Sequence, residues 1–229
     1  MPMTIIGVIA ALLAIVVATV MDGNSFGALI GPSSLVLVLL GTFGVTLAGY
    51  QISDLSRVPK ALTTALFGKV GPPTEIVSRL VAAAETARRE GVLALEPMLE
   101  DIDDNFLRSG LQQVVDGLDG EAVKDMLEIE IASIEERHGT MIGFFKTLGG
   151  FAPTMGMIGT VIGLINMLGN LSDPSQLGLG LSVALLTTLY GVVFANLIFL
   201  PVANKMQRLH DAEMTTKELA LDGVLAIQA

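Results

Sequence analysis

Four long apolar stretches alternate with charged segments along this chain. They cover residues 3–20, 33–50, 141–168 and 177–200. A helix needs about 20 largely uncharged residues to span the hydrocarbon core of a bilayer, and each stretch is close to that length. Lys146 lies near the start of the third stretch, from which a lysine side chain reaches the headgroup region. With no pattern typical of β-strands, the sequence predicts an all-α polytopic membrane protein with four transmembrane helices.

The first apolar stretch has a second interpretation, as a secretory signal that is removed from the mature protein. Such a signal carries a positively charged segment before the apolar run and small residues at a cleavage site after it. No lysine or arginine precedes residue 3, and no convincing small-residue cleavage site follows residue 20. The sequence therefore favours a retained first span.

Lysines and arginines are distributed unevenly among the connecting segments. The connections at residues 21–28 and 169–176 contain none. The basic residues outside the apolar stretches are Arg57, Lys60, Lys69, Arg79, Arg88, Arg89, Arg108, Lys124 and Arg137 in the middle segment, and Lys205, Arg208 and Lys217 after the fourth span. Because cytoplasmic segments of membrane proteins are enriched in lysine and arginine, both termini and the middle segment are predicted to be cytoplasmic.

The middle segment is predicted to be a folded helical module, since its apolar residues recur at helical spacing. Thr74 and Glu75 follow a proline pair and are typical of an N-cap and a first-turn acid, and Gly91 is typical of a helix end. The run from residue 121, proline-free as far as Pro153, predicts one long helix that continues into the third span, with residues 201–226 as a helix packed beside it. The predicted domains are residues 1–50 (spans one and two), 51–140 (cytoplasmic module), 141–200 (spans three and four) and 201–229 (C-terminal helix).

Composition excludes several classes of function. The chain has 13 Lys+Arg against 23 Asp+Glu, a formal net charge of −10, which argues against binding to nucleic acid. It has no cysteine, and its two histidines, His138 and His210, lack metal-ligand spacing, so both are predicted to be surface residues without a bound metal or cofactor. No motif typical of a nucleotide-binding or hydrolytic enzyme is present, and we expect no enzyme activity.

Small residues and hydroxyls recur at helical spacing in the third and fourth spans. Gly156, Thr160 and Gly163 share one face with Pro153, and Thr188 and Gly191 share another. Small faces allow close helix approach in lipid, and spacing alone favours ordinary contacts within one chain, with threonines bonded to their own backbone. The alternative is a path for a small cation whose counter-charge comes from another chain, because neither span contains a carboxylate.

Two sequence segments in these spans resemble one protein family. FAPTMGMIGTVIGL (residues 151–164) and DPSQLGLGLSVALLTTLYGVVFANLIFLPVANK (residues 173–205) are similar to the MotA/PomA flagellar stator subunits of the MotA/TolQ/ExbB group, and the resemblance extends over nearly the whole chain. It implies a pentamer in the bacterial inner membrane, surrounded by lipid and built around a MotB/PomB-type partner anchored to peptidoglycan. In that family the partner supplies the ion-carrying carboxylate, and ion flow drives the rotor protein FliG.

The resemblance also assigns roles to individual residues. Sodium-driven members resemble this chain in having hydroxyls at the positions of Thr160 and Thr188, so the transported ion is expected to be Na⁺ rather than H⁺, bound transiently near both threonines. Thr187 lies about 100° round the helix and is expected to face packing. Pro153 and Pro201 match the two prolines that couple the ion path to the cytoplasmic module.

ARREGVLALE (residues 87–96) resembles the family's charged motif, which implies that Arg88, Arg89 and Glu96 contact the rotor. Without the resemblance, these charges would be interpreted as a solvated helix face. Two other functions stay open: a TolQ/ExbB-like energy-transducing subunit, and a self-contained channel or scaffold in which the small faces only pack helices.

Overall fold

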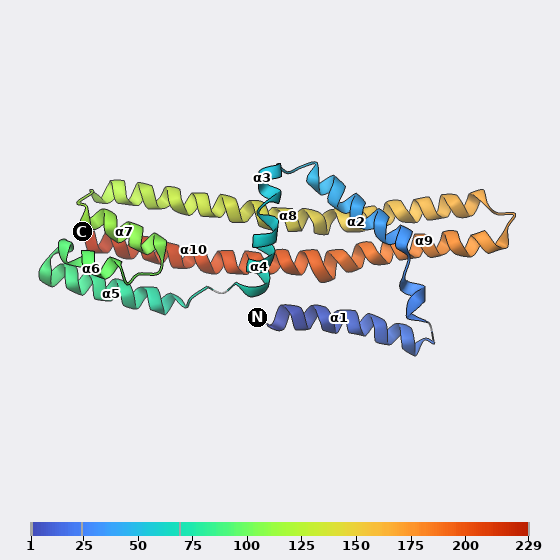
Figure 1. Ribbon diagram of the computed structural model, residues 1–229, viewed down its shortest axis with the longest axis horizontal. Helices are drawn as coiled ribbons and strands as arrows, with labels where there is room; N and C mark the ends of the chain where they lie inside the picture. Colours follow the sequence, from blue (N-terminus) through green and yellow to red (C-terminus); the bar gives the residue numbers. More distant parts are fainter. Residues whose placement is uncertain (1, 24, 69, 229) are drawn as a thin grey trace. The chain divides into compact units, whose positions relative to one another are not determined.

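The structure, a computed structural model, describes residues 2–23, 25–68 and 70–228, and all regular secondary structure in these residues is helical (Figure 1). The predicted all-α class is therefore confirmed. Two compact units form, one from Met1–Gly68 with Thr140–Met206 and the other from Lys69–Gly139 with Gln207–Ala229. Lys69, one of the basic residues in the topology argument, lies outside the described residues.

The first unit contains the apolar helices. Its elements are α1 (Pro2–Met21), the 3₁₀ turn Phe26–Leu29, α2 (Pro32–Leu47), α3 (Ile52–Leu55), α4 (Val58–Phe67), the later part of α8 (Gly120–Gly169), α9 (Pro174–Val193), the π-helical segment Phe194–Phe199 and the start of α10 (Leu200–Gln228). Within the part of the chain that the structure describes, three helical stretches are long and apolar enough to cross a bilayer: Gly27–Leu47, Gly120–Gly169 and Gln176–Gln228. The described apolar part of α1, Ile5–Met21, is shorter.

Helices α3 and α4 group with the apolar helices, although residues 51–68 belong to the segment predicted as a cytoplasmic module. The Tyr50 hydroxyl lies 3.3 Å from the Thr147 hydroxyl, and its ring meets Phe144 edge-on at a centroid distance of 5.2 Å. Ala65 of α4 is buried in the same apolar cluster as Phe144 and Phe145. Small residues on α4 thus allow it to pack closely in this unit.

The long helix predicted from residue 121 is confirmed, because α8 runs without interruption from Gly120 to Gly169. The helix predicted over residues 201–226 is also present, as α10. The sequence did not predict the π-helical segment before α10, in which the Leu200 N–H donates to the Ala195 carbonyl, five residues back. Pro201 has no N–H and its ring crowds the preceding turn, so a wider turn accommodates it.

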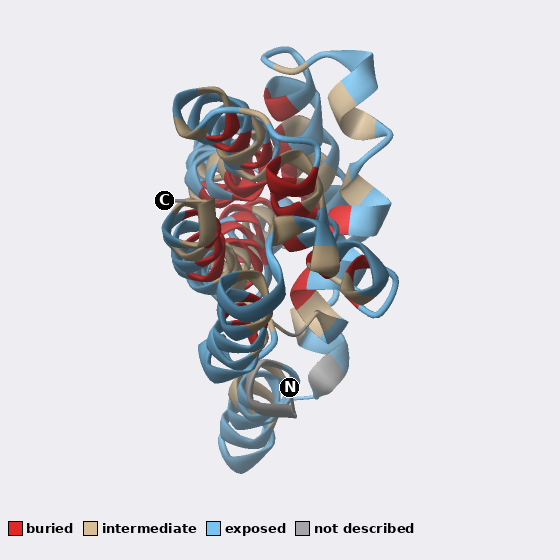
Figure 2. Cartoon of the chain, turned by 90° about the vertical axis from the view of Figure 1, so that its left-hand side faces the viewer, coloured by how far each residue is buried: buried red, intermediate tan, exposed pale blue. Residues whose placement is uncertain are grey.

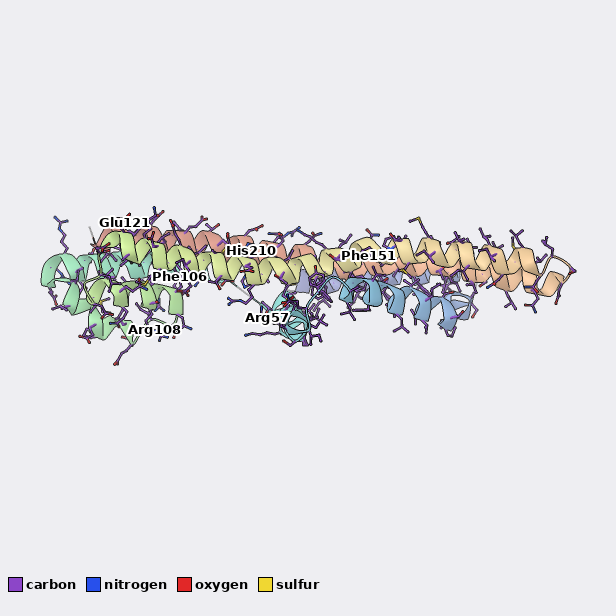
Figure 3. The ribbon with its side chains drawn as sticks, turned by 90° about the horizontal axis from the view of Figure 1, so that it is seen from above. Arg57, Phe106, Arg108, Glu121, Phe151 and His210 are labelled. Atoms are coloured by element: carbon purple, nitrogen blue, oxygen red, sulfur yellow. The ribbon has the colours of Figure 1, made fainter. Side chains whose placement is uncertain are left out.

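The second unit adds α5 (Pro73–Glu90), the 3₁₀ turn Val92–Leu95, α6 (Glu96–Leu99) and α7 (Asn105–Val115) to the beginning of α8 and the end of α10. The core of this unit is formed by fully buried side chains: Leu95, Phe106, Leu107, Leu111, Leu127 and Val224. Figure 2 colours buried residues red, and Figure 3 labels Phe106. Helix α5 begins at Pro73, so the N-cap predicted at Thr74 is wrong: proline's fixed φ suits the first helical position. Gly91, at φ +87°, ends this helix as predicted.

One carboxylate ties α7 to α10 in the second unit. The Asp104 carboxylate accepts a hydrogen bond from the Leu107 N–H at 3.0 Å, which caps α7, and accepts the Lys217 ammonium at 2.9 and 3.0 Å. The Lys217 ammonium also lies 5.1 Å from the centre of the Phe106 ring. Burial raises the pKa of Asp104, but the hydrogen bonds from Lys217 and the Leu107 amide outweigh it, so the net pKa lies below its ordinary value.

Replacing Lys217 by methionine is expected to destabilise the protein by about 2 kcal/mol at neutral pH, because it leaves a partly buried carboxylate without its cation. Asp104→Asn keeps an N-cap acceptor and loses only the ion pair. Because folding lowers the pKa of Asp104, the stabilisation is complete above its unfolded pKa of about 3.9 and is lost as the pH falls through the lower folded value. The unfolding temperatures of wild type and Lys217→Met should therefore become equal in acid. A difference in unfolding temperature that is the same at every pH would contradict this explanation.

The sequence predicts both histidines as surface residues but does not predict that they are in contact with each other. His138 of α8 and His210 of α10 are half-buried and in contact, with their Nδ1 atoms 3.3 Å apart. Helical periodicity predicted that these two segments pack together but did not fix which faces meet, and therefore missed the pair.

Candidate ion-path site

Helices α8 and α9 lie side by side in the first unit because glycines remove the side chains between them (Figure 1). A Cβ atom added to Gly163 would lie 2.7 Å from both the Ala184 nitrogen and the Gly180 carbonyl oxygen. One added to Gly191 would lie 2.6 Å from the Ala152 carbonyl oxygen. These distances are shorter than a carbon atom tolerates, so only glycine permits this approach.

Gly156 has the same function about two turns before Gly163 in α8, since a Cβ there would lie 2.8 Å from the Thr187 carbonyl oxygen. The small-residue faces predicted on the two spans therefore meet each other within one chain. This is the packing interpretation that spacing alone favoured. The two predicted threonines, Thr160 and Thr188, lie at the edge of this contact.

Thr160 and Thr188 lie at that edge and are joined by a hydrogen bond between their hydroxyls. The Thr160 hydroxyl also lies 3.1 Å from the Gly156 carbonyl oxygen and 3.1 Å from the Ala184 carbonyl oxygen. The Thr188 hydroxyl lies 3.3 Å from the same Ala184 oxygen. Thr188 is exposed and Thr160 is partly exposed, so the cluster is accessible from outside the chain.

The cluster has more acceptors than donors. Two hydroxyl oxygens and two carbonyl oxygens share two hydroxyl protons, and each oxygen has two lone pairs. Carbonyl and hydroxyl oxygens are ligands of hard cations. The cluster can therefore contribute oxygen ligands to a small cation, but it carries no negative charge of its own.

Thr187 has a different environment from its neighbour Thr188. Thr187 is completely buried, and a Cβ added to Gly159 would lie 2.5 Å from the Cβ of Thr187. Its hydroxyl donates to carbonyls of its own helix, at Val183 or Ala184. Thr187 thus packs α9 against α8, in the orientation that its helical position predicted.

The two predicted prolines lie in α8 and in the first turn of α10. Pro153 is inside α8, where its α-carbon would be 3.1 Å from a Cβ on Gly191. Because proline has no N–H, the carbonyl four residues earlier cannot receive the usual helical bond at either Pro153 or Pro201. Both sites therefore leave a backbone acceptor without its helical donor, and near Pro201 the helix geometry also changes, in the π-helical segment.

Sequence reasoning missed Tyr190, which fixes the start of α2 against α9. Its hydroxyl donates to the Leu29 carbonyl at 2.5 Å and accepts the Gly31 N–H at 2.8 Å. The signal available in the sequence is a tyrosine inside an apolar span, since a buried hydroxyl requires a partner. This anchor holds the 3₁₀ turn and α2 beside the helix that carries Thr188.

The charged motif lies in the second unit, at the turn where α5 ends. Arg88 and Arg89 are exposed in the last turn of α5, and Glu96 is exposed at the start of α6. Arg89 has a 3.8 Å contact with Glu90, whose side chain is also exposed. Leu95, completely buried beside Glu96, anchors the segment, so the charges project from a fixed turn.

Together these features define a class: a multi-pass helical membrane protein whose apolar spans, free of carboxylates, present an oxygen cluster suited to a small cation. Residues 98–219 match the family described as the MotA/TolQ/ExbB proton channel family. The chain belongs to this family, as its sequence motifs indicated. Its members are channel subunits rather than enzymes, in agreement with the sequence analysis.

Similar proteins match over almost the whole chain. Motility protein A of Treponema phagedenis is 42% identical over 98% of this chain and 86% of its own length. Chemotaxis protein PomA of Vibrio alginolyticus is 37% identical over 98% of this chain and 88% of its own length. The flagellar MotAB stator complex of Bacillus subtilis contains a chain with a TM-score of 0.89 and 33% identity, covering 99% of this chain and 89% of that one.

Proposed function

We propose that the protein is a stator subunit of a bacterial flagellar motor that conducts Na⁺ together with a MotB/PomB-type partner. The similarity to a motility protein and to a MotAB stator chain supports a motor subunit over a TolQ/ExbB-like subunit. We further propose that it acts as a homopentamer in the lipid of the inner membrane, with both termini cytoplasmic. The basic residues of the middle segment and of α10 support this orientation.

One observation carries the proposal: Thr160 and Thr188 join two carbonyl oxygens in a cluster within the apolar stretches 141–168 and 177–200, which contain no carboxylate. A proton needs only a titratable group and a water chain, whereas Na⁺ that loses hydration water needs replacement oxygens. The cluster supplies such oxygens, and the partner would supply the charge. This division of ligands favours Na⁺ over H⁺ and transient binding over a permanent site.

Thr160→Ala and Thr188→Ala should each reduce Na⁺-driven motility by about tenfold or more, because each removes a hydroxyl ligand from the route. Thr154→Ala is the matched control, since Thr154 is an exposed threonine of α8 whose hydroxyl bonds only its own helix, at Gly150. The measurement is swimming speed against Na⁺ concentration at fixed proton-motive force. Speed that does not depend on Na⁺ in the wild type would exclude sodium as the transported ion.

Pro153 and Pro201 are proposed to couple the ion path to the cytoplasmic unit. Two local features support this proposal. The Pro153 backbone packs closely against Gly191 of α9, and Pro201 lies two residues after the π-helical segment. Both helices that carry these prolines continue from the first unit into the second. A change of helix geometry at either proline is thus covalently connected to the second unit.

Arg88, Arg89 and Glu96 are proposed to contact a FliG-type rotor protein. Exposed charges contribute little affinity but set the rate and register of encounter, which suits a contact that forms and releases repeatedly. Arg88→Glu and Glu96→Lys should strongly reduce torque while the amount of assembled membrane protein stays unchanged. If either variant fails to assemble, the residue has a structural function instead.

A further inference from the structure

The two histidines of the chain form a contact that the motor function does not use. His138 comes from α8 and His210, labelled in Figure 3, from α10, and both belong to the second unit. Their rings are nearly perpendicular, with centroids 5.5 Å apart and an interplanar angle of 81°. The Nδ1 atoms are 3.3 Å apart, so two nitrogen atoms that can bind a metal come close together from positions far apart in sequence.

This separation matches a zinc chelate. Two imidazole nitrogens, each about 2.0–2.1 Å from a tetrahedral Zn²⁺, lie about 3.3 Å from each other. We propose that His138 and His210 form a two-histidine binding site for Zn²⁺ that links α8 to α10 in the cytoplasmic unit. The alternative is a simple N–H···N hydrogen bond between neutral rings, which the same distance permits.

The surroundings suit a weak, solvent-accessible site. Both rings are half-buried, and burial lowers the pKa of His138, while the nearby carboxylate of Glu213 raises it and the charges of His210 and Arg137 lower it. No group of three or more His, Cys, Asp or Glu side chains in the described part of the chain is placed to hold an ion. The protein thus supplies two ligands, and water completes the coordination.

Two ligands instead of the usual four predict an affinity in about the micromolar range. A bound ion would connect the two helices and stabilise the folded unit by mass action, since the unfolded chain does not hold the histidines together. The site therefore offers a metal-dependent constraint on the two helices that continue into the ion path.

The test is a zinc titration of the purified, tag-free full-length protein by calorimetry and thermal unfolding. We expect one site per chain, an increase in unfolding temperature with Zn²⁺ but not with Mg²⁺, and an affinity at least about tenfold weaker in His138→Gln and His210→Gln. Glu218→Gln, which removes an exposed carboxylate from α10, is the control and should bind as the wild type does. Equal binding by all variants, or no binding by the wild type up to about a millimolar, would overturn the proposal and leave the hydrogen bond.

A second measurement needs no variant. The chain contains two histidines, so carbethoxylation followed by mass spectrometry reports on this pair alone. Zn²⁺ should protect both His138 and His210 from modification with the same concentration dependence. Modification rates that do not change with Zn²⁺ would contradict the site even if histidine variants fold poorly.

Discussion

Replacing Gly163 by alanine is expected to abolish motility and to lower the stability of the membrane-spanning unit. The added methyl group would meet backbone atoms of α9, at Ala184 and Gly180, at 2.7 Å. Backbone cannot rotate away as a side chain does, so the helices must separate, at a cost of about 1–3 kcal/mol or more. Separation would also break the contact between Thr160 and Thr188, because these hydroxyls lie on the two helices that move apart.

Gly150→Ala is the matched control for this prediction. Gly150 also lies in α8, but a Cβ at this position meets no atom within 4 Å. The two variants should differ in unfolding temperature in detergent, in the amount assembled in the membrane and in swimming speed. If Gly163→Ala behaves as Gly150→Ala does in all three, the close approach of α8 and α9 is not required for function.

Much of the fold could be predicted because hydrophobic periodicity and length determine long apolar helices. The long α8 followed from a run that is free of proline as far as Pro153, and the end of α5 followed from Gly91. The glycine faces of α8 and α9 could be identified for the same reason, since residues three or four apart share one side of a helix. These features are local, and a single helix contains the information that specifies them.

Features that depend on how two helices meet could not be predicted. The contact between His138 and His210 requires the rotation of α8 relative to α10, which periodicity leaves undetermined. Tyr190 bonds to backbone far away in sequence, at Leu29 and Gly31. Residues 51–68 were assigned to the cytoplasmic module from their position between spans, whereas their packing groups them with the apolar helices.

The second prediction with a large expected effect is that ion conduction requires a MotB/PomB-type partner. Spans three and four contain no Asp or Glu, so the oxygen cluster at Thr160 and Thr188 cannot neutralise a cation. Holding an unpaired ion at membrane depth is costly, and an ion there requires a counter-charge. The chain alone is therefore expected to conduct no more than lipid does, whereas the complex with a MotB/PomB-type partner conducts. One charge that crosses 100 mV releases about 2.3 kcal/mol, so sustained work requires repeated passage through this shared site.

Sodium flux into proteoliposomes under an imposed membrane potential tests this central claim most directly. Four samples suffice: the chain alone, the chain with its partner, and the same complex carrying Thr160→Ala or the Thr154→Ala control. The account predicts flux for the complex and for the Thr154→Ala control, and loss of flux for the chain alone and for Thr160→Ala. Flux through the chain without any partner would contradict it and would show a self-contained channel.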